Sequence, residues 1–357
     1  MVAKYAAEYE KLRQDHFARQ SRKTYLRYED AVSNGTDIDW AGYEIPEPKK
    51  LGITVFDDVN LEDLLGFMDW TPFFQAWELH GRYPKLLDDE VVGEEARKLL
   101  KDAQVLLNRI VKDKLLQAKG VVGLFPANRS GGDDIALFTD ASRSEELATF
   151  HCLRQQHKKG AGAFNQSLAD FIAPAQAGVD YIGTFALTTG IGLDALVAEF
   201  EADHDDYNSI MAKALADRLA EAFAEYLHHK VRTEIWGYAL DEKLENDQLI
   251  REKYRGIRPA PGYPACPDHT EKGILFDLLE ATSRTGITLT ESFAMLPTAA
   301  VSGFYFAHPE SRYFGLGKIG EDQVMAYAER KGMSKSAAER WLGPNLNYEP
   351  NRDKAAD

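Results

Sequence analysis

Residues 254–269 read Tyr-Arg-Gly-Ile-Arg-Pro-Ala-Pro-Gly-Tyr-Pro-Ala-Cys-Pro-Asp-His, and this stretch constrains the fold around it. It contains four prolines and Gly262. Proline lacks a backbone donor and fixes φ, so neither a helix nor a central strand can form here. The sequence therefore predicts a stiff, irregular loop.

Such a loop holds backbone donors and acceptors in fixed directions, which suits the recognition of a polar small molecule. Arg258 offers a planar cationic fork, and Tyr263 offers an aromatic face with a hydroxyl. The alternative is a rigid turn with a purely structural role.

The composition indicates a folded, acidic protein. The chain has 357 residues, of which 44% are hydrophobic, and this length fits one large domain or two intimate ones. The 42 Lys and Arg against 57 Asp and Glu give a net charge of −15, which argues against nucleic acid or an anionic membrane as partner. Cys152 and Cys266 form no disulfide framework, so a reducing, cytoplasmic location is expected. No stretch is long enough for a membrane span or resembles a signal peptide.

Residues 1–50 are expected to form an N-terminal helix and a linker ahead of the compact domain. The helix is predicted over Val2–Ser33 from apolar residues at helical intervals among many polar ones. Asp37–Leu51 contains two prolines and is expected to run as an extended linker over the body. The compact domain is placed at 51–347, and 348–357 is expected to be a polar, frayed tail. This arrangement also suggests a chain cut from a longer protein.

The middle of the chain is rich in predicted strands joined by short turns. Without crossover helices between them, an antiparallel sheet is expected. Gly120 and Gly123 are too sparse for a dinucleotide fingerprint, and no helix follows them. After the proline-rich stretch, two strands are expected to form a hairpin with a third. The predicted strands span 53–59, 120–129, 135–139, 150–157, 168–174, 180–188, 289–297, 300–307 and 314–319.

Helices complete an α+β fold. Two lie between Gly192 and Trp236, and the second carries a long apolar seam typical of a core helix. Glu221 and Glu225 flank that seam, so Glu221 either lies on a solvated face or turns toward a cationic ligand. A shorter acidic helix delivers Glu252 just ahead of the proline-rich stretch. The predicted helices span 94–119, 206–233, 241–254, 271–284, 322–331 and 334–342.

Asp69 lies in the apolar stretch Phe67-Met-Asp-Trp-Thr-Pro-Phe-Phe74, shortly after a helix start capped by Asn60. An unpaired carboxylate is costly in such surroundings, so Asp69 should have a partner. It either caps a helix or pairs with a core arginine, or it receives the ammonium group of a ligand.

Several long motifs, in this order, resemble the C-terminal activation domain of cobalamin-dependent methionine synthase. The resemblance covers nearly the whole chain, and its motifs lie at 67–74, 123–129, 216–225, 258–269 and 289–295. It implies a C-shaped α+β domain around a twisted antiparallel sheet that binds S-adenosylmethionine. In that family the domain remethylates the cofactor after its oxidation to cob(II)alamin, using an electron from flavodoxin or a related flavoprotein.

The resemblance also suggests roles for individual residues. Arg258 can hold the ligand carboxylate through a charge-assisted fork, and the backbone around Ala260 and Gly262 can bind the adenine edge. The site residues expected from the matched motifs are Asp69 on the ammonium, Tyr263, Tyr313 and Phe314 along the ligand, and Glu221 and Glu252 as catalytic residues on the sulfonium side. The methyl group must reach an incoming cobalamin, so a shallow groove is expected.

Other modules of the enzyme are not recognised in this sequence. It has no cysteine cluster for the zinc of a homocysteine module, no folate-binding barrel and no Asp-x-His-x-x-Gly motif for cobalamin. The chain is thus expected to be a fragment that works with a separate cobalamin-binding domain. One alternative is a non-catalytic docking module for that domain and a flavoprotein. Another is a metal enzyme that uses Cys266, His269 and a remote carboxylate.

Overall fold

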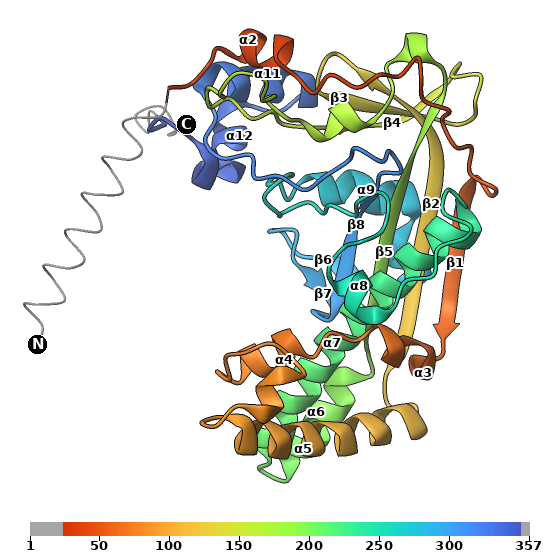
Figure 1. The fold of residues 1–357 in the computed structure, drawn as a ribbon, viewed down its shortest axis with the longest axis vertical. Helices are drawn as coiled ribbons and strands as arrows, with labels where there is room; N and C mark the ends of the chain where they lie inside the picture. Colours follow the sequence, from red (N-terminus) through yellow and green to blue (C-terminus); the bar gives the residue numbers. More distant parts are fainter. Residues whose placement is uncertain (1–23, 351–357) are drawn as a thin grey trace, which may run out of the picture.

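The computed structural model describes residues 24–350, so most of the helix predicted at Val2–Ser33 lies outside the described part. Within the described part of that stretch, only α2 (Tyr28–Ser33) is helical. Residues 24–27 are not, and the backbone of Arg27 is extended with ψ of 150°, so the prediction of one continuous helix up to Ser33 is wrong. Figure 1 shows a C-shaped outline in which long strands form a spine and an upper and a lower arm project from it toward one side. None of the described helices combines the length and apolar character that crossing a bilayer requires.

The predicted antiparallel sheet is confirmed. Its strands follow the order β4-β3-β2-β5-β8, and β1 also pairs with β2. The long β2 carries β5 along one edge, while β1 and β3 share its other edge, β1 along the first part of β2 and β3 along the second. The strands are β1 (Gly52–Val59), β2 (Gln117–Ser130), β3 (Asp134–Phe138), β4 (Glu146–His151), β5 (Asp180–Ile191) and β8 (Ala300–Tyr305).

Helices cover both faces of the sheet, which explains why β5 is buried almost throughout. Val122 and Phe185 belong to one apolar core with α7, while Val121 and Ala186 belong to a second core with α9 and α10. The larger helices are α5 (Gly93–Lys112), α6 (Leu193–Ala202), α7 (Asp206–Lys230), α9 (Glu271–Leu279), α11 (Glu321–Lys331) and α12 (Lys335–Trp341). Shorter helices are α3 (Leu61–Leu64), α4 (Thr71–Ala76), α8 (Asn246–Ile250) and α10 (Ala281–Thr285).

Gly123 shows why glycine occurs in β2. A Cβ there would lie 2.4 Å from Cε2 of Phe125 and 2.8 Å from Cδ2 of Leu279. The glycine therefore lets the end of α9 approach the sheet closely.

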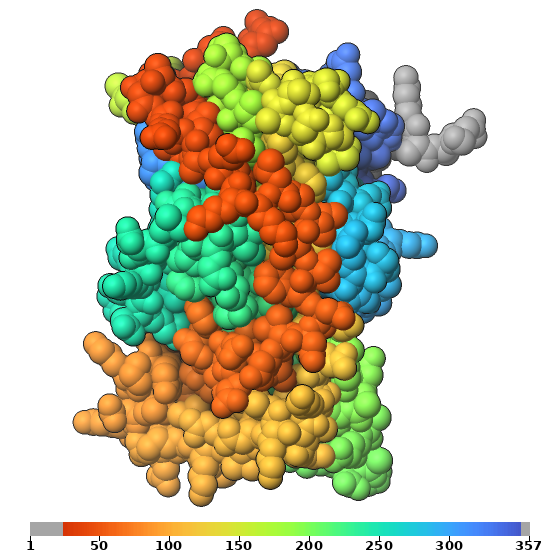
Figure 2. Space-filling model, turned by 90° about the vertical axis from the view of Figure 1, so that its right-hand side faces the viewer, coloured from red at the N-terminus to blue at the C-terminus, as the bar shows by residue number. Residues whose placement is uncertain are grey.

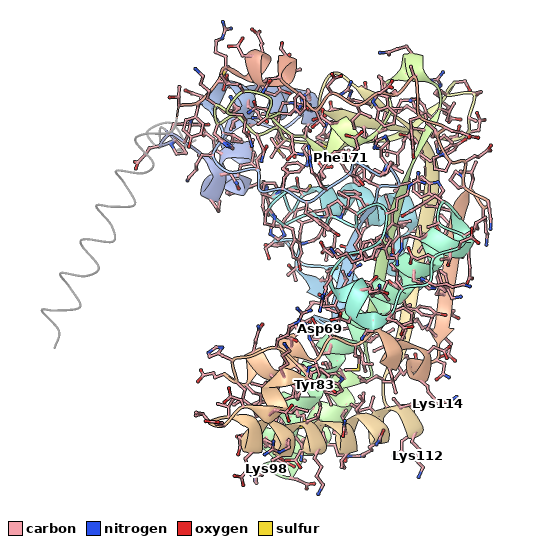
Figure 3. All side chains as sticks on the ribbon, viewed as in Figure 1. Asp69, Tyr83, Lys98, Lys112, Lys114 and Phe171 are labelled. Carbon is pink, nitrogen blue, oxygen red and sulfur yellow. The ribbon has the colours of Figure 1, made fainter. Side chains whose placement is uncertain are left out.

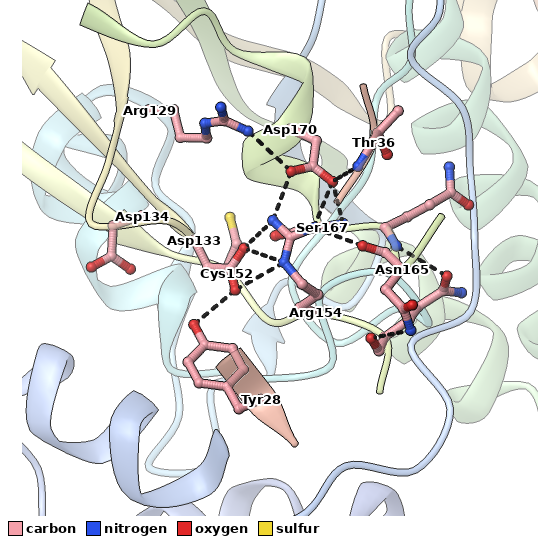
Figure 4. A network of polar contacts seen from close by, with 12 residues as sticks. Tyr28, Thr36, Arg129, Asp133, Asp134, Cys152, Arg154, Asn165, Ser167 and Asp170 are labelled. Carbon is pink, nitrogen blue, oxygen red and sulfur yellow. Dashed lines mark hydrogen bonds and ion pairs between the residues drawn. The ribbon is translucent and has the colours of Figure 1, made fainter. Parts of the chain in front are cut away.

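Residues 37–51 contain no helix or strand. Figure 2 shows the first described residues as a red-to-orange band over one face. Just before this segment, Tyr28 and Thr36 are held by a buried network of ion pairs and hydrogen bonds (Figure 4). Arg154 donates to Asp133 and Asp170 at 2.9 and 2.7 Å, Tyr28 Oη donates to Asp133 at 2.8 Å, and the backbone N of Thr36 donates to Asp170 at 3.1 Å.

Three helix predictions were too long. Residues 94–119 were predicted as one helix, but α5 ends at Lys112 because Gln117 already begins β2. The helix predicted over 241–254 is reduced to α8 (Asn246–Ile250). The one predicted over 271–284 is divided by Glu280, which adopts a left-handed conformation with φ of 48°.

The strand predicted at 168–174 is wrong. Leu168–Phe171 forms a 3₁₀ turn, at whose start the Asp170 side chain accepts a hydrogen bond from the backbone N of Ser167 at 3.0 Å. The strand predicted at 150–157 is β4 (Glu146–His151), after which only isolated bridges continue.

The hairpin predicted after the proline-rich stretch is also wrong. Residues 314–319 form no strand, and β8 (Ala300–Tyr305) pairs with β5. The stretch 289–297 yields only the short pair β6 (Thr288–Leu289) and β7 (Met295–Leu296). At the other edge of β8, backbone hydrogen bonds join Ile257 to Phe306, and Phe304 N donates to Pro259 O at 2.9 Å. The proline-rich stretch itself therefore covers the edge that the predicted hairpin would have used.

Candidate functional site

Residues 257–267, here called the proline ribbon, run along the edge of β8 and then turn tightly. Gly262 makes the turn with φ of 95°, and its N donates to the carbonyl of Cys266 at 2.7 Å. A Cβ at Gly262 would lie 2.3 Å from Cε1 of His269, so a larger residue would collide with that ring. The ribbon is thus held on one side by β8 and at its turn by His269.

A cleft of about 560 Å³ opens beside the ribbon. Its walls come from the ribbon, from Glu221 on α7, from Glu252 and from the segment around Tyr313, and Phe185 and Val301 of the sheet contribute to its lining. Seven of the nine predicted site residues line this cleft, namely Glu221, Glu252, Arg258, Ala260, Tyr263, Tyr313 and Phe314. The cleft is open, because 60% of Tyr263 and 40% of Tyr313 are exposed.

Arg258 contributes a positively charged side chain to the cleft lining. One of its terminal nitrogens, Nη1, is already hydrogen-bonded within the protein. Its Nη1 donates to Oε2 of Glu225 at 2.6 Å and to Oη of Tyr254 at 3.0 Å. Burial alone would lower the pKa of Arg258, but the Glu225 carboxylate outweighs burial and raises it. The guanidinium therefore stays charged.

Two carboxylates face the same space. Burial raises the pKa of Glu221, while the nearby Arg218 and Arg258 oppose that rise. Burial also raises the pKa of Glu252, again against the effect of Arg258. The cleft thus combines the Arg258 guanidinium with the carboxyl groups of Glu221 and Glu252. A cationic ligand would favour the charged forms of both carboxyl groups.

The aromatic residues add protonated hydroxyls and apolar walls. Oη of Tyr313 accepts a hydrogen bond from the backbone N of Arg258 at 3.0 Å, which fixes the ring at the start of the ribbon. Burial raises the pKa of Tyr263 and of Tyr313, so both phenols remain neutral near pH 7. Phe314 and Phe185 contribute aromatic surface beside them. Such a combination suits a ligand with a flat ring and a zwitterionic end.

Comparison with known proteins identifies the kind of domain to which this cleft belongs. Residues 60–332 match the family described as vitamin B12 dependent methionine synthase, activation domain. The chain belongs to this family. A crystal structure of the MetH reactivation domain bound to AdoHcy is similar to it, with 54% sequence identity and a TM-score of 0.89. The similarity covers 91% of this chain and 99% of that one.

Two predicted site residues of this activation domain do not line the cleft. Gly262 has the turn-forming role described above. Asp69 lies one residue before Trp70, the N-cap of α4, and accepts a hydrogen bond from the backbone N of Thr71 at 2.9 Å. Figure 3 places Asp69 on the concave side, where the lower arm meets the middle of the molecule.

The residues behind Arg258 were not predicted as part of the site. Glu225 was recognised only as a flank of the α7 seam, and His228 and Tyr254 were given no role. One signal was available: a helical core residue that is acidic requires a partner, and Glu225 lies one turn from Glu221. Only the fold shows that the partner is Arg258.

The metal-enzyme alternative finds no support in the activation domain. Among residues 24–350, no three or more His, Cys, Asp and Glu side chains are grouped so that they could hold a metal ion. Nδ1 of His269 lies 2.8 Å from Nζ of Lys272, and burial raises the pKa of the Cys266 thiol well above its usual range.

Proposed function

We propose that this activation domain binds S-adenosylmethionine in the cleft beside the proline ribbon and supplies its methyl group to cobalamin during reactivation. The observation that carries the proposal is the meeting of Arg258, Glu221 and Glu252 with four aromatic residues in one cleft. The AdoHcy bound by the MetH reactivation domain supports it, because AdoHcy is S-adenosylmethionine without the methyl group.

Each part of the ligand has a proposed partner. Arg258 holds the α-carboxylate, and the backbone of Ala260 and Gly262 hydrogen-bonds the adenine edge. Asp69 receives the ammonium in addition to its hydrogen bond from the backbone N of Thr71. Tyr263, Tyr313 and Phe314 pack along the nucleoside. Glu221 and Glu252 lie on the sulfonium side and act as the catalytic carboxylates.

The proposed chemistry depends on positioning. Methyl transfer is an in-line displacement at carbon, so it requires no general base. Reduced cobalamin, presented by a separate domain, supplies the electron pair that forms the new bond to the methyl carbon, and the carbon–sulfur bond breaks to leave a neutral thioether. Starting from cob(II)alamin, one electron must come from a reductant, for which flavodoxin or a related flavoprotein is proposed.

The carboxylates must stabilise the cation without holding it too strongly. The sulfonium loses its positive charge in the transition state, so tight binding by Glu221 and Glu252 would favour the ground state and slow transfer. Their raised pKa values and the opposing charge of Arg258 agree with a moderate interaction. The exposure of Tyr263 and Tyr313 leaves the cleft accessible to a second domain.

The complete enzyme to which the domain belongs, and its location in the cell, are also proposals. The domain would act within a cobalamin-dependent methyltransferase whose zinc belongs to a homocysteine module, and a cytoplasmic location stays a prediction from composition. The pure docking alternative is not favoured, because the similar MetH domain binds AdoHcy.

Titration calorimetry with S-adenosylmethionine and S-adenosylhomocysteine tests the proposal. We expect saturable binding of both ligands by the purified chain, and binding weaker by about tenfold to a hundredfold when Arg258 is replaced by alanine. Guanosine at the same concentrations serves as a control for nonspecific nucleoside binding. No saturable heat with either adenosyl ligand would contradict the proposed function.

A further inference from the structure

Arg258 is held from behind by three side chains of the buried core. Its Nη1 lies 2.6 Å from Oε2 of Glu225, 3.0 Å from Oη of Tyr254 and 3.3 Å from Nδ1 of His228. Among the described residues, every side-chain hydrogen bond of Arg258 uses Nη1. The other edge of the guanidinium, Nη2 and Nε, therefore has no competing protein partner there.

The position of Glu225 is itself fixed from the interior. Its side chain is 8% exposed, and its Oε1 faces Nη1 of Arg232 at 3.7 Å. Arg232 is fully buried and donates two hydrogen bonds to Oε1 and Oε2 of Glu242, at 2.7 and 2.9 Å. The four charges alternate from the interior to the cleft, in the order Glu242, Arg232, Glu225 and Arg258.

His228 completes the group as a neutral acceptor. It is fully buried on α7, and burial, with Arg232 and Arg258 nearby, lowers the pKa of its imidazole well below the usual value. A neutral ring can accept at Nδ1, whereas an imidazolium would repel Arg258. Its ring also lies parallel to that of Tyr305, with 5.1 Å between the centroids. Glu225 and His228 both belong to α7, so a rigid helix defines the place of Nη1.

We propose that Glu225 is a positioning residue for ligand binding: it fixes Nη1 of Arg258 so that Nη2 and Nε face the cleft as a fork for the ligand's carboxylate. A guanidinium binds a carboxylate best through two parallel N–H donors, and this requires one edge to be presented in a fixed orientation. Glu225 does not itself line the cleft. Its effect on the ligand therefore passes through Arg258. This inference rests on the proposed function.

The test compares two ligands that differ at the amino-acid end. S-adenosylhomocysteine carries the carboxylate, whereas 5′-methylthioadenosine has the same nucleoside and thioether without it. For Glu225→Gln, we expect the affinity for S-adenosylhomocysteine to fall about tenfold and that for 5′-methylthioadenosine to change by less than about twofold. A general loosening of the cleft would weaken both ligands equally and would overturn the inference.

A double-mutant cycle provides a second, independent readout. In the Arg258→Ala background, Glu225→Gln should cause no further loss of S-adenosylhomocysteine affinity, because the group through which it acts is gone. Additive losses would contradict a role through Arg258. Tighter binding by Glu225→Gln would show that Glu225 competes with the ligand for Arg258, which also contradicts the proposal.

Matched variants separate positioning from stability. Asp133→Asn also removes a buried carboxylate from an arginine, but in the network of Figure 4, and should leave the ratio of the two affinities unchanged. If Glu225→Gln does not fold, Tyr254→Phe removes a milder contact to the same Nη1 and should show a smaller loss that is again confined to S-adenosylhomocysteine. An equal effect on both ligands in that variant would overturn the inference. If the wild-type chain binds neither ligand, the proposed function fails, and the positioning role fails with it.

Discussion

Arg258 and Glu221 face the same cleft but are expected to affect different steps. Arg258 has one edge free for the ligand and one edge on a buried carboxylate, whereas Glu221 lies among opposing charges that moderate its own. A group that binds substrate and transition state alike changes affinity, while a group whose interaction changes with the reaction alters rate.

Replacing Arg258 by alanine should therefore weaken S-adenosylmethionine binding, by about tenfold to a hundredfold, because charge-assisted hydrogen bonds contribute about 1.5 to 3 kcal/mol. Glu221→Gln should change affinity much less and mainly alter the rate at which the cobalamin of a complete enzyme is remethylated. Calorimetry and a reactivation assay measure the two effects. Equal loss of affinity in both variants would contradict this division of roles.

Gly262 is expected to be sensitive to the smallest substitution. Its φ of 95° is unfavourable for other residues, and a Cβ would lie 2.3 Å from the His269 ring. Gly262→Ala should lower the free energy of unfolding by about 1 to 3 kcal/mol and weaken ligand binding, since the ribbon turn must shift. Gly160, where a Cβ meets nothing within 4 Å, provides the control. Chemical denaturation measures the difference, and equal stability of the two variants would contradict the prediction.

Among the elements, β5 begins with a carboxylate in an unusual environment. Burial raises the pKa of Asp180 to about 7, although the backbone N–H groups of Ala173 and Tyr181 donate to it and oppose the rise. Between its ordinary value near 3.8 and this raised value, the folded chain binds a proton that the unfolded chain has released. Asp180 therefore destabilises the fold increasingly as the pH rises through that range.

The unfolding free energy of the wild type relative to Asp180→Asn should fall by up to about 1.4 kcal/mol per pH unit across that interval and become flat above it. Urea denaturation at a series of pH values measures this difference, and the variant serves as reference for all other titrating groups. A difference that does not change with pH would show that Asp180 titrates normally.

α7 shows how one element combines the core and the site. Its apolar side packs in the core that includes Val122 and Phe185. Glu221 lines the cleft, and Glu225 accepts a hydrogen bond from Arg258. Because both carboxylates come from one rigid helix, their spacing at the site is set by helical geometry. The ribbon, in contrast, depends on backbone hydrogen bonds to β8 for its place.

Across the whole molecule, the upper part is joined to the N-terminal segment by the network around Arg154. This arginine is 1% exposed and pairs with Asp133 and Asp170, which also hold Tyr28 and Thr36. Removing one partner of a buried ion pair leaves an uncompensated charge.

Arg154→Met should destabilise the chain by about 3 to 5 kcal/mol, because two buried carboxylates lose their cation. Ligand affinity, measured where the variant is still folded, should be unchanged, since the network does not line the cleft. Thermal unfolding and calorimetry report the two quantities. A loss of affinity with intact stability would indicate coupling between this network and the cleft.

The amino-acid sequence by itself determined the antiparallel character of the sheet, the α7 core seam and the irregular proline ribbon, since each follows from local periodicity or from the chemistry of proline. The long motifs also indicated seven residues that meet in the cleft. Only the tertiary structure decided that the ribbon occupies the edge of β8, that α5 ends at Lys112 and that residues 168–171 form a 3₁₀ turn in place of a strand. These outcomes depend on which segments pair across large sequence separations. The same reason applies to Glu225, whose partner Arg258 lies 33 positions away, because burial and pairing arise only when the fold brings such residues together.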